Sequence, residues 1–186
     1  MKISAKGFPV YLETIAASDA GDFAKQINDP EILKGVSNPA SPMPYPYTNE
    51  HAINFIRTLH DAHLQGRMVS FAIRSAKTKE FLGSVGISEI DAKGRSCEIL
   101  YWLGRKHWGS GYAKAAVKLA LAYAFGKLGM AKVEAFVYPD NERSISFSKS
   151  AGFVELGALG DGKSERIMLA IFKRDYKDNT VIKVVQ

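Results

Sequence analysis

"HWGSGYAKAA", residues 107–116, is the stretch that decides the fold of this chain. Gly109 and Gly111 stand one residue apart, directly before a segment with helical periodicity. Glycines where a strand gives way to a helix let consecutive backbone N–H groups point outward at the helix N-terminus, and such a cradle suits pyrophosphate. A side chain at either glycine would hold a ligand away from the backbone. Because glycines are also ordinary turn residues, phosphate binding and a plain turn both stay open on spacing alone.

The segments on either side of this stretch alternate between strand and helix patterns. A proline-rich loop at residues 37–47 separates the first two helices, the first of which we expect to stop at Pro30. The tail, residues 180–186, is ambiguous. We predict strands at residues 8–15, 69–75, 80–90, 96–103, 131–138, 153–159 and 164–172. We predict helices from Ser18 or Asp19 to residue 29 and at residues 49–65, 112–128 and 139–152.

Composition sets limits on the class of protein. The chain has 186 residues, a formal net charge of +6 and 46% hydrophobic residues, which is enough for one packed domain over residues 1–186. No run of like charges indicates direct nucleic-acid binding, and no apolar segment indicates a signal peptide or a membrane span. The single cysteine, Cys97, excludes an internal disulfide and suits the cytoplasm. We therefore expect a cytoplasmic protein.

Polar residues near the glycine pair are candidates for chemistry. In the strand at 96–103, alternation places Glu98 on one face with Leu100 and Trp102. Apolar neighbours should raise the pKa of the Glu98 carboxyl, unless the residue lies at a solvated strand end. Asn141 suits the cap of the following helix, and Ser144 and Ser148 fall one helical turn apart on it, either as a reactive pair or as a polar face.

Together these motifs resemble the GNAT N-acetyltransferase superfamily, and most closely its RimJ/RimL-like branch of ribosomal-protein N-terminal acetyltransferases. The acyl-CoA signature is similar to Trp108-Gly109-Ser110-Gly111-Tyr112-Ala113, "EILYWL" resembles the fourth strand of the family, and "NERSISFSKSAGF" resembles its Asn-x-x-Ser helix. The resemblance covers nearly the whole chain. It implies an α/β (α+β) fold, with a mixed, mostly antiparallel sheet that splays between residues 96–103 and 131–138 at a V-shaped acyl-CoA cleft.

The resemblance also implies roles for individual residues. Glu98 matches the position proposed as general base, and Ser144 the position proposed to protonate the departing thiolate. The implied co-substrate is acetyl-CoA, with no metal, and the acetyl group would pass directly to a primary amine. The residues implied to bind acetyl-CoA are Tyr101, Trp102 and Leu103 through their main chain, Trp108, Gly109, Ser110, Gly111, Tyr112, Ala113, Asn141 and Ser148.

Two positions depart from the pattern of the family. Lys114-Ala115-Ala116 stands where the branch often carries an acidic residue, and Ser148 stands where many members have a tyrosine as general acid. The proton donor is therefore Ser144, Ser148 or solvent. His60 and His63, three residues apart on a predicted helix, are too few for a metal site, and we expect an exposed imidazole at His107.

The acceptor is the least defined part of the prediction. An α-amine with a pKa of about 7.7–8.0 needs only about 1 kcal/mol to lose its proton at pH 7, whereas a lysine at about 10.4 needs roughly 4–5 kcal/mol. A protein N-terminal α-amine is therefore favoured, with polyamines and antibiotic amines as alternatives. A non-catalytic acyl-CoA-binding module is the rival from another class. We expect a monomer or a homodimer.

Overall fold

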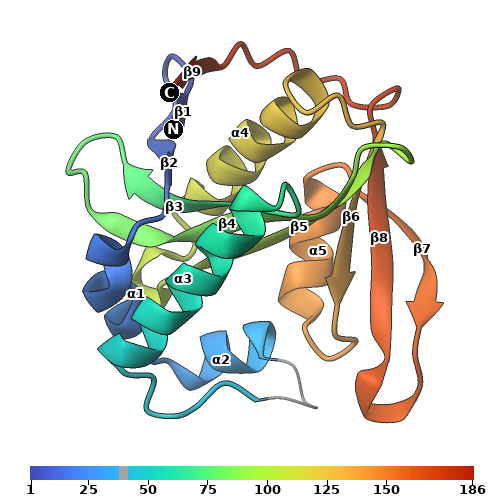
Figure 1. Ribbon diagram of the computed structural model, residues 1–186. Helices are drawn as coiled ribbons and strands as arrows, with labels where there is room; N and C mark the ends of the chain where they lie inside the picture. The colour runs from blue at the N-terminus through green and yellow to red at the C-terminus, as the bar shows by residue number, and fades with distance from the viewer. Residues whose placement is uncertain (38–41) are drawn as a thin grey trace.

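The computed structural model describes residues 1–37 and 42–186, so the first part of the predicted proline-rich loop, residues 38–41, lies outside the described residues. Within them, nine strands form one sheet in the order β7-β8-β6-β5-β4-β3-β2-β1-β9 (Figure 1). The strands are β1 (Lys2–Ser4), β2 (Val10–Thr14), β3 (Val69–Ser75), β4 (Phe81–Asp91), β5 (Ser96–Leu103), β6 (Lys132–Val137), β7 (Val154–Leu159), β8 (Arg166–Phe172) and β9 (Lys183–Val185).

The sheet opens between β5 and β6. These two strands are the parallel pair, and their pairing covers only Ser96–Glu98 against Lys132–Glu134, whereas the other neighbours run antiparallel. Beyond Glu98 the strands diverge, so the second half of β5 and the end of β6 border a gap (Figure 1). The mixed, mostly antiparallel sheet and its splay are confirmed.

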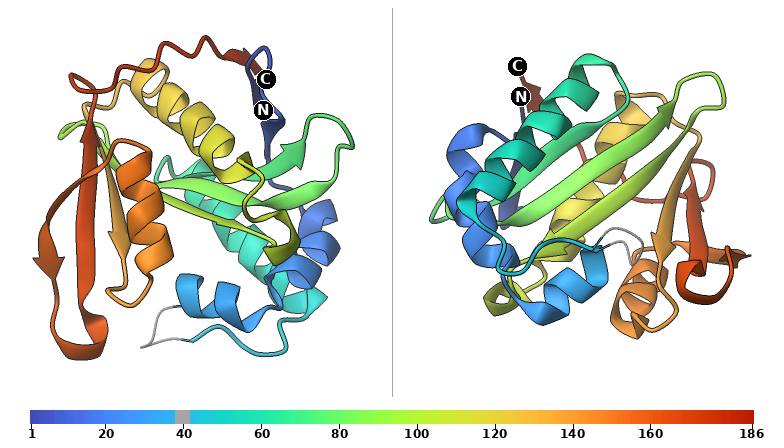
Figure 2. Two further views of the ribbon diagram at one scale, coloured as in Figure 1. Left: turned by 180° about the vertical axis from the view of Figure 1, so that it is seen from behind. Right: turned by 60° about the horizontal axis from the view of Figure 1, so that its bottom comes forward.

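Helices cover both faces of the sheet (Figure 2). The helix α4 (Tyr112–Gly126) lies on one face, and α1 (Ala20–Ile27) and α3 (Asn49–Leu64) lie on the other. The helix α5 (Glu142–Ser150) packs beside β6, and α2 (Pro30–Val36) lies near the end of β5. Short 3-10 turns occur at η1 (Ala17–Asp19), η2 (Arg105–His107) and η3 (Gly162–Ser164).

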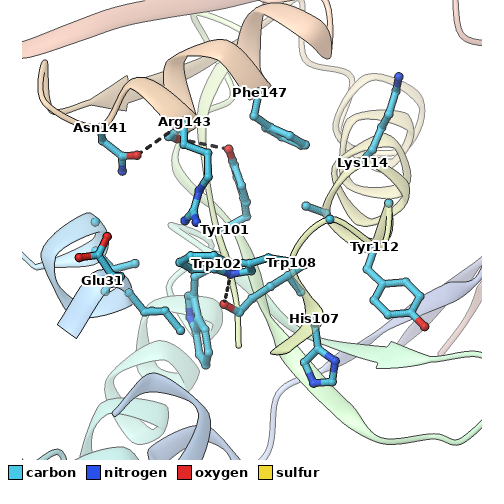
Figure 3. Close-up of a pocket in the computed structure, with 18 of the residues that line it drawn as sticks. Glu31, Tyr101, Trp102, His107, Trp108, Tyr112, Lys114, Asn141, Arg143 and Phe147 are labelled. Carbon is cyan, nitrogen blue, oxygen red and sulfur yellow. Dashed lines mark hydrogen bonds between the residues drawn. The ribbon is translucent and has the colours of Figure 1, made fainter. Parts of the chain in front are cut away.

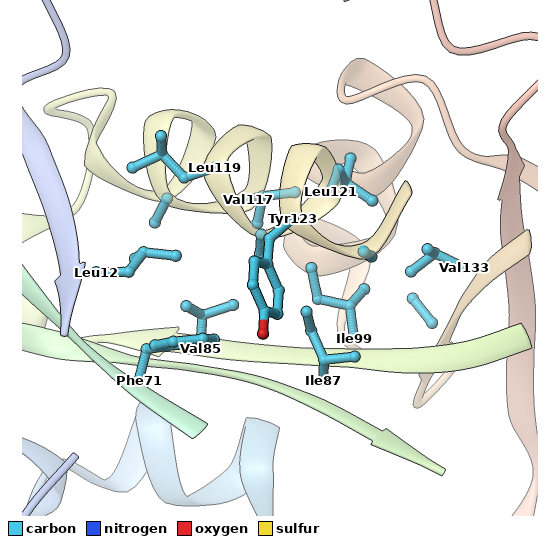
Figure 4. Packing of buried hydrophobic residues seen from close by; sticks show 14 of the residues in the cluster. Leu12, Phe71, Val85, Ile87, Ile99, Val117, Leu119, Leu121, Tyr123 and Val133 are labelled. Atoms are coloured by element: carbon cyan, nitrogen blue, oxygen red, sulfur yellow. The ribbon is translucent and has the colours of Figure 1, made fainter. Parts of the chain in front are cut away.

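Each face of the sheet has its own apolar core. On the α4 side, Val117, Leu121 and Tyr123 pack over Phe71 and Ile99 (Figure 4). Small alanines along α4 let the helix backbone lie close to the sheet. The helix is apolar over most of its surface because most of that surface is buried. On the other face, α1 and α3 cover β3 and β4 through a second core around Phe23, Ile56 and Phe81. The central strands of the sheet are thus covered on both faces.

The structure corrects the predicted elements near the ends. The first helix stops before Pro30 as expected, since α1 ends at Ile27. Pro30 also begins α2, which was not predicted, and Asp29 caps this helix by accepting a hydrogen bond from the Glu31 N–H at 2.9 Å. A proline in the first turn lacks only an N–H that would have no partner there. Residues 2–4 form β1, which was not predicted, and the ambiguous tail supplies β9, which pairs with β1.

Candidate functional site

Two cavities meet in the gap between β5 and β6. The first, which we call the cradle cavity, has a volume of about 360 Å³ and lies between residues 107–114, the end of β5 and α5. The second, which we call the larger cavity, has a volume of about 690 Å³ and lies on the face of the sheet covered by α1 and α3. Both cavities are lined by Gly35, Val36, Tyr101, Trp102, Asn141 and Ser144. The two cavities therefore adjoin each other along these residues.

The glycine pair of the sequence lies at the N-terminus of α4. Gly109 and Gly111 have φ angles of +74° and +77°, which glycine adopts without strain, and a Cβ at either would meet no heavy atom within 4 Å. Among the described residues, no hydrogen-bond acceptor pairs with the backbone N–H groups of residues 109–114. The Trp108 indole N–H donates to the Leu103 carbonyl oxygen at 2.8 Å and fixes this segment to the end of β5.

The charge around this segment favours an anion. The first turn of α4 has no acidic residue, and Lys114 in that turn lines the cradle cavity (Figure 3). Arg143 extends from α5 so that its guanidinium carbon lies 3.3 Å from the centre of the Trp108 ring. Free N–H groups, the helix dipole and the two cations, Lys114 and Arg143, suit a pyrophosphate. The residues at this site therefore fit the pyrophosphate of acetyl-CoA. Ser110 is exposed and does not line the cavity.

One face of β5 carries the three side chains that the sequence placed together. Glu98, Leu100 and Trp102 all line the larger cavity, and Leu100 is 44% exposed there. Burial raises the pKa of the Glu98 carboxyl, and the charges of Glu89 and Glu134 act in the same direction, whereas the Arg166 guanidinium opposes them. The direction agrees with the expectation from the sequence. Glu98 is thus a half-buried carboxylate at the wall of a cavity that communicates with the cradle.

The opposite face of β5 presents a group that the sequence analysis missed. The Tyr101 hydroxyl lies 3.2 Å from Ser144 Oγ, and the Tyr101 ring packs on Phe147, with ring centres 4.9 Å apart. Burial raises the pKa of the Tyr101 phenol, which keeps it protonated at neutral pH. Only the main chain of Tyr101 was expected to take part in binding. Strand alternation did contain a signal, because it turns Tyr101 away from Glu98 and toward the helix that carries Ser144.

The helix α5 begins as predicted. Asn141 caps it, because its side-chain oxygen accepts a hydrogen bond from the Ser144 N–H at 3.1 Å. Ser144 lines both cavities, whereas Ser148 is buried and lines the larger cavity alone. Asn141, Ser144 and Tyr101 therefore meet where the two cavities join.

The unpredicted helix α2 spans the gap in the sheet. Its Lys34 Nζ lies 2.9 Å from a carboxylate oxygen of Asp140, in the turn before α5. A Cβ at Gly35 would lie 3.1 Å from the side-chain nitrogen of Asn141, so the backbone of α2 approaches that side chain closely. The helix thus closes one side of the junction between the cavities.

The histidines do not form a second site. The expected exposed imidazole at His107 is wrong, because His107 is only 8% exposed and lies 3.3 Å from the Gln26 side-chain nitrogen. His63 contacts the Met68 carbonyl oxygen at 3.3 Å. In residues 1–37 and 42–186, no group of three or more His, Cys, Asp or Glu side chains is arranged to hold a metal ion. No helix in the same residues is long and apolar enough to cross a membrane.

A splayed sheet with an anion cradle at the start of α4 is the arrangement that the resemblance to the GNAT acetyltransferases implies. The family model described as "Acetyltransferase (GNAT) domain" matches residues 10–154. The chain therefore belongs to the GNAT acetyltransferase family, and it is an acetyltransferase that uses acetyl-CoA.

Individual relatives agree with this assignment. The chain is 31% identical over 172 residues to the uncharacterized N-acetyltransferase p20 of Bacillus licheniformis, covering 89% of this chain and 93% of that protein. It is 24% identical to a spermidine N(1)-acetyltransferase of Vibrio cholerae, covering 78% of this chain and 81% of the relative. Among solved structures, Mycobacterium smegmatis RimJ in complex with CoA-disulfide superposes with a TM-score of 0.84 at 22% identity, covering 96% of this chain and 90% of the other. This likeness shows that the two proteins share a fold.

Proposed function

We propose that this protein transfers the acetyl group of acetyl-CoA directly to a primary amine, in the first place a protein N-terminal α-amine, with Glu98 as general base. The observation that carries the proposal is the junction of the two cavities, with the cradle on one side and Glu98 on the other. Acetyl-CoA supplies an acetyl group activated as a thioester. The two substrates would therefore meet in the strand gap.

Most of the residues proposed to hold acetyl-CoA line the cradle cavity, whereas Ser110 lies beside it and Ser148 lines the larger cavity. The backbone N–H groups of Gly109, Ser110, Gly111, Tyr112 and Ala113 would bind its pyrophosphate, and Trp108 fixes their position. Asn141 and Ser148 would lie against the thioester end of the molecule. The main chain of Tyr101, Trp102 and Leu103 would pair with the amide groups of the pantetheine arm, because this part of β5 has no partner strand on the side of β6.

Glu98 is suited to remove a proton from the incoming ammonium group, directly or through water. Burial raises the pKa of the Glu98 carboxyl toward the pKa of an α-amine. The smaller difference between the two pKa values makes proton transfer from the ammonium group to Glu98 less unfavourable. A module that only bound acyl-CoA would need no such carboxylate in the second cavity. The proposal therefore favours a catalyst over a binding module.

Proton return to the leaving sulfur is assigned to Ser144. Its hydroxyl shares a hydrogen bond with Tyr101, so the phenol can replace the proton that Ser144 gives up. The Tyr101 phenol thereby adds a candidate that the sequence analysis did not consider. Ser148 is the alternative donor.

The preference for an α-amine rests on acidity. A single carboxylate is enough to deprotonate an amine with a pKa near 8, because the cost at pH 7 is small. An amine with a pKa above 10 costs more free energy to deprotonate and suits a single carboxylate less well. The relative that acts on spermidine keeps a small-amine acceptor open as the alternative. We propose that residues 1–186 act as one acetyltransferase domain, as a cytoplasmic monomer or homodimer, without direct nucleic-acid or membrane contacts.

The test is release of free thiol from acetyl-CoA, measured across N-terminal peptides, lysine-containing peptides blocked at the N-terminus and polyamines, with acetyl-CoA binding followed by calorimetry. We expect the first group to react fastest. Mass spectrometry of the products then locates the acetyl group. Binding of acetyl-CoA without thiol release on every amine would support the module instead. Faster reaction of polyamines would support the small-amine alternative.

A further inference from the structure

We propose that the larger cavity selects amines whose amine-bearing carbon carries a large aromatic side chain with a polar atom at its far end, as in tyrosine or tryptophan. This inference rests on the proposed function, since it names the acceptor of the same site. It follows from the shape, the charge and one unpaired hydroxyl of the cavity.

Apolar side chains dominate the wall of the larger cavity. Phe23, Phe55 and Trp102 form an aromatic cluster in which the Phe23 and Trp102 rings meet edge to face, with centres 5.0 Å apart. Phe55, Leu100 and Val36 are 36–44% exposed, although they are large and apolar, and all three border this cavity. Apolar surface gathered in a concave site is typical of a place that a ligand covers.

The size of the cavity also favours a large substituent. A volume of about 690 Å³ lies within the usual range for sites that enclose a small molecule. The methyl group of an alanine would leave most of this wall in contact with water, whereas a phenol or an indole would cover it. The difference between these side chains is expected to change kcat/KM by about 10–100-fold.

Charge in the cavity argues against a polyamine acceptor. Among the described residues that line it, Glu98 and Arg166 are the ionised side chains. A second ammonium group on the acceptor would find no further carboxylate there, and it would share the cavity with a guanidinium. Glu89 and Glu134 influence Glu98 electrostatically but do not line the cavity, and Glu134 is paired with Lys132 Nζ at 2.8 Å.

The floor of the larger cavity contains an unused hydroxyl. Ser70 is 5% exposed, lines the cavity, and its Oγ is the buried side-chain polar atom without a hydrogen-bond partner in the described part of the chain. Leaving such a group unpaired is unfavourable, so an incoming polar atom is expected to gain from it. Ser84 in the same cavity differs, because its hydroxyl donates to the Phe71 carbonyl oxygen at 2.9 Å.

The position of Ser70 matches the far end of an aromatic acceptor. Ser70 pairs with Gly86, and Gly86 pairs with Leu100, so the three residues lie in one row across the sheet. Leu100 is two residues from Glu98, which places Ser70 about 10 Å across and about 7 Å along the sheet from Glu98. Both residues line the cavity, and a hydrogen bond of about 3 Å at each end would take up part of this span. An amine at Glu98 and a phenol or indole at Ser70 are therefore compatible with one bound molecule.

The experiment compares amides of single amino acids, which share the α-amine and differ in the side chain. We expect kcat/KM for thiol release to fall from tyrosinamide and tryptophanamide to phenylalaninamide, then to leucinamide and alaninamide, with spermidine slowest. Equal or better reaction of alaninamide or spermidine would overturn the inference while leaving the proposed acetyl transfer intact. If no amine reacts although acetyl-CoA binds, the proposed function itself fails.

Substitutions of the two serines test the polar contact. Ser70→Ala should lower kcat/KM for tyrosinamide by about 10-fold and leave phenylalaninamide unchanged. Because the replaced hydroxyl is unpaired, the variant should unfold at a temperature no lower than the parent. Ser84→Ala is the matched control, and it should keep the ratio of tyrosinamide to phenylalaninamide. An equal effect of Ser70→Ala on both amides would remove Ser70 from the recognition of the acceptor.

Discussion

The two cavities that meet in the strand gap are built in different ways. The proposed anion site of the cradle cavity comes mostly from backbone N–H groups of one continuous segment, residues 108–114, with Arg143 of α5 beside it. The larger cavity takes its wall from residues of α1, α2, α3 and α5 and of five neighbouring strands, β3, β4, β5, β6 and β8. A site made of backbone depends on a few φ angles, whereas a site made of side chains depends on how separate elements pack. Side-chain substitutions can therefore reshape the wall of the larger cavity for a different acceptor without altering the backbone site of the cradle cavity.

The largest expected effect separates the chemistry of the larger cavity from binding in the cradle. Glu98→Gln keeps the shape of the side chain and removes the proton acceptor, so we expect turnover at pH 7 to fall by about 10²–10⁴-fold. The affinity for acetyl-CoA should stay constant in calorimetry, because Glu98 does not line the cradle cavity. The deficit should shrink as the pH rises toward 9, since solvent then supplies the neutral amine.

The same variant tests the raised pKa of Glu98. Burial disfavours the charged carboxylate in the folded state, so this residue destabilises the fold as the pH rises above its unfolded pKa of about 4.5. Glu98→Gln should therefore unfold at a higher temperature than the parent at pH 7, and the two should converge below pH 4. Glu155→Gln, on exposed β7, is the control for turnover. Loss of acetyl-CoA affinity, or full turnover at pH 7, would make Glu98 a structural carboxylate.

The next effect tests the cradle. Gly111→Asn adds a side chain where the backbone should meet phosphate, and asparagine tolerates the left-handed φ of +77° better than other residues. We expect the affinity for acetyl-CoA to fall by about 10–100-fold, which is the worth of one or two hydrogen bonds to a charged group. Gly129→Asn is the matched control, because Gly129 has a φ of +72° just beyond the other end of α4 and also faces open space. Equal loss in both variants would mean that the glycines are ordinary turn residues.

The contrast between backbone and side chains also explains what the sequence could predict. The glycine turn before α4 could be predicted because Gly109 and Gly111 are near neighbours in the sequence. Period-two alternation likewise predicted that Glu98 shares a face with Leu100 and Trp102. The contact between Tyr101 and Ser144 joins residues 43 positions apart, and the burial of His107 depends on Gln26, which lies 81 positions away. Such contacts follow from packing, which no local pattern encodes. Ser70 is a lone serine in a strand, and only the assembled cavity makes it conspicuous.

A smaller effect tests proton return at the junction of the cavities. A thiol has a pKa near 8.5, so its thiolate leaves readily near neutral pH and needs little help. We expect Ser144→Ala and Tyr101→Phe each to lower turnover by about 2–10-fold, with Ser148→Ala having the smaller effect. Because Ser144 and Tyr101 act through one hydrogen bond, the double variant should lose no more than the worse single variant. A more damaging Ser148→Ala would assign the proton donor to Ser148, and additive losses would separate Tyr101 from Ser144.

The smallest expected effect concerns the ion pair that joins α2 to the turn before α5. Lys34 and Asp140 lie 2.9 Å apart, but their side chains are 64% and 60% exposed, so solvent and salt screen the attraction. If the pair helps α2 to close the junction of the cavities, Lys34→Ala should raise the KM for the amine by less than about threefold at low salt. The difference from the parent should vanish near 1 M salt, where the screening length is about 3 Å.

Lys149→Ala is the matched control, because it breaks a comparable exposed pair with Glu155 at 2.8 Å that does not border either cavity. A change of tenfold or more would mean that α2 contributes to acceptor binding as strongly as the aromatic wall does. An equal small change in both variants would mean that the ion pair acts only on the surface, and that the packing of Gly35 against Asn141 is what holds α2 across the gap.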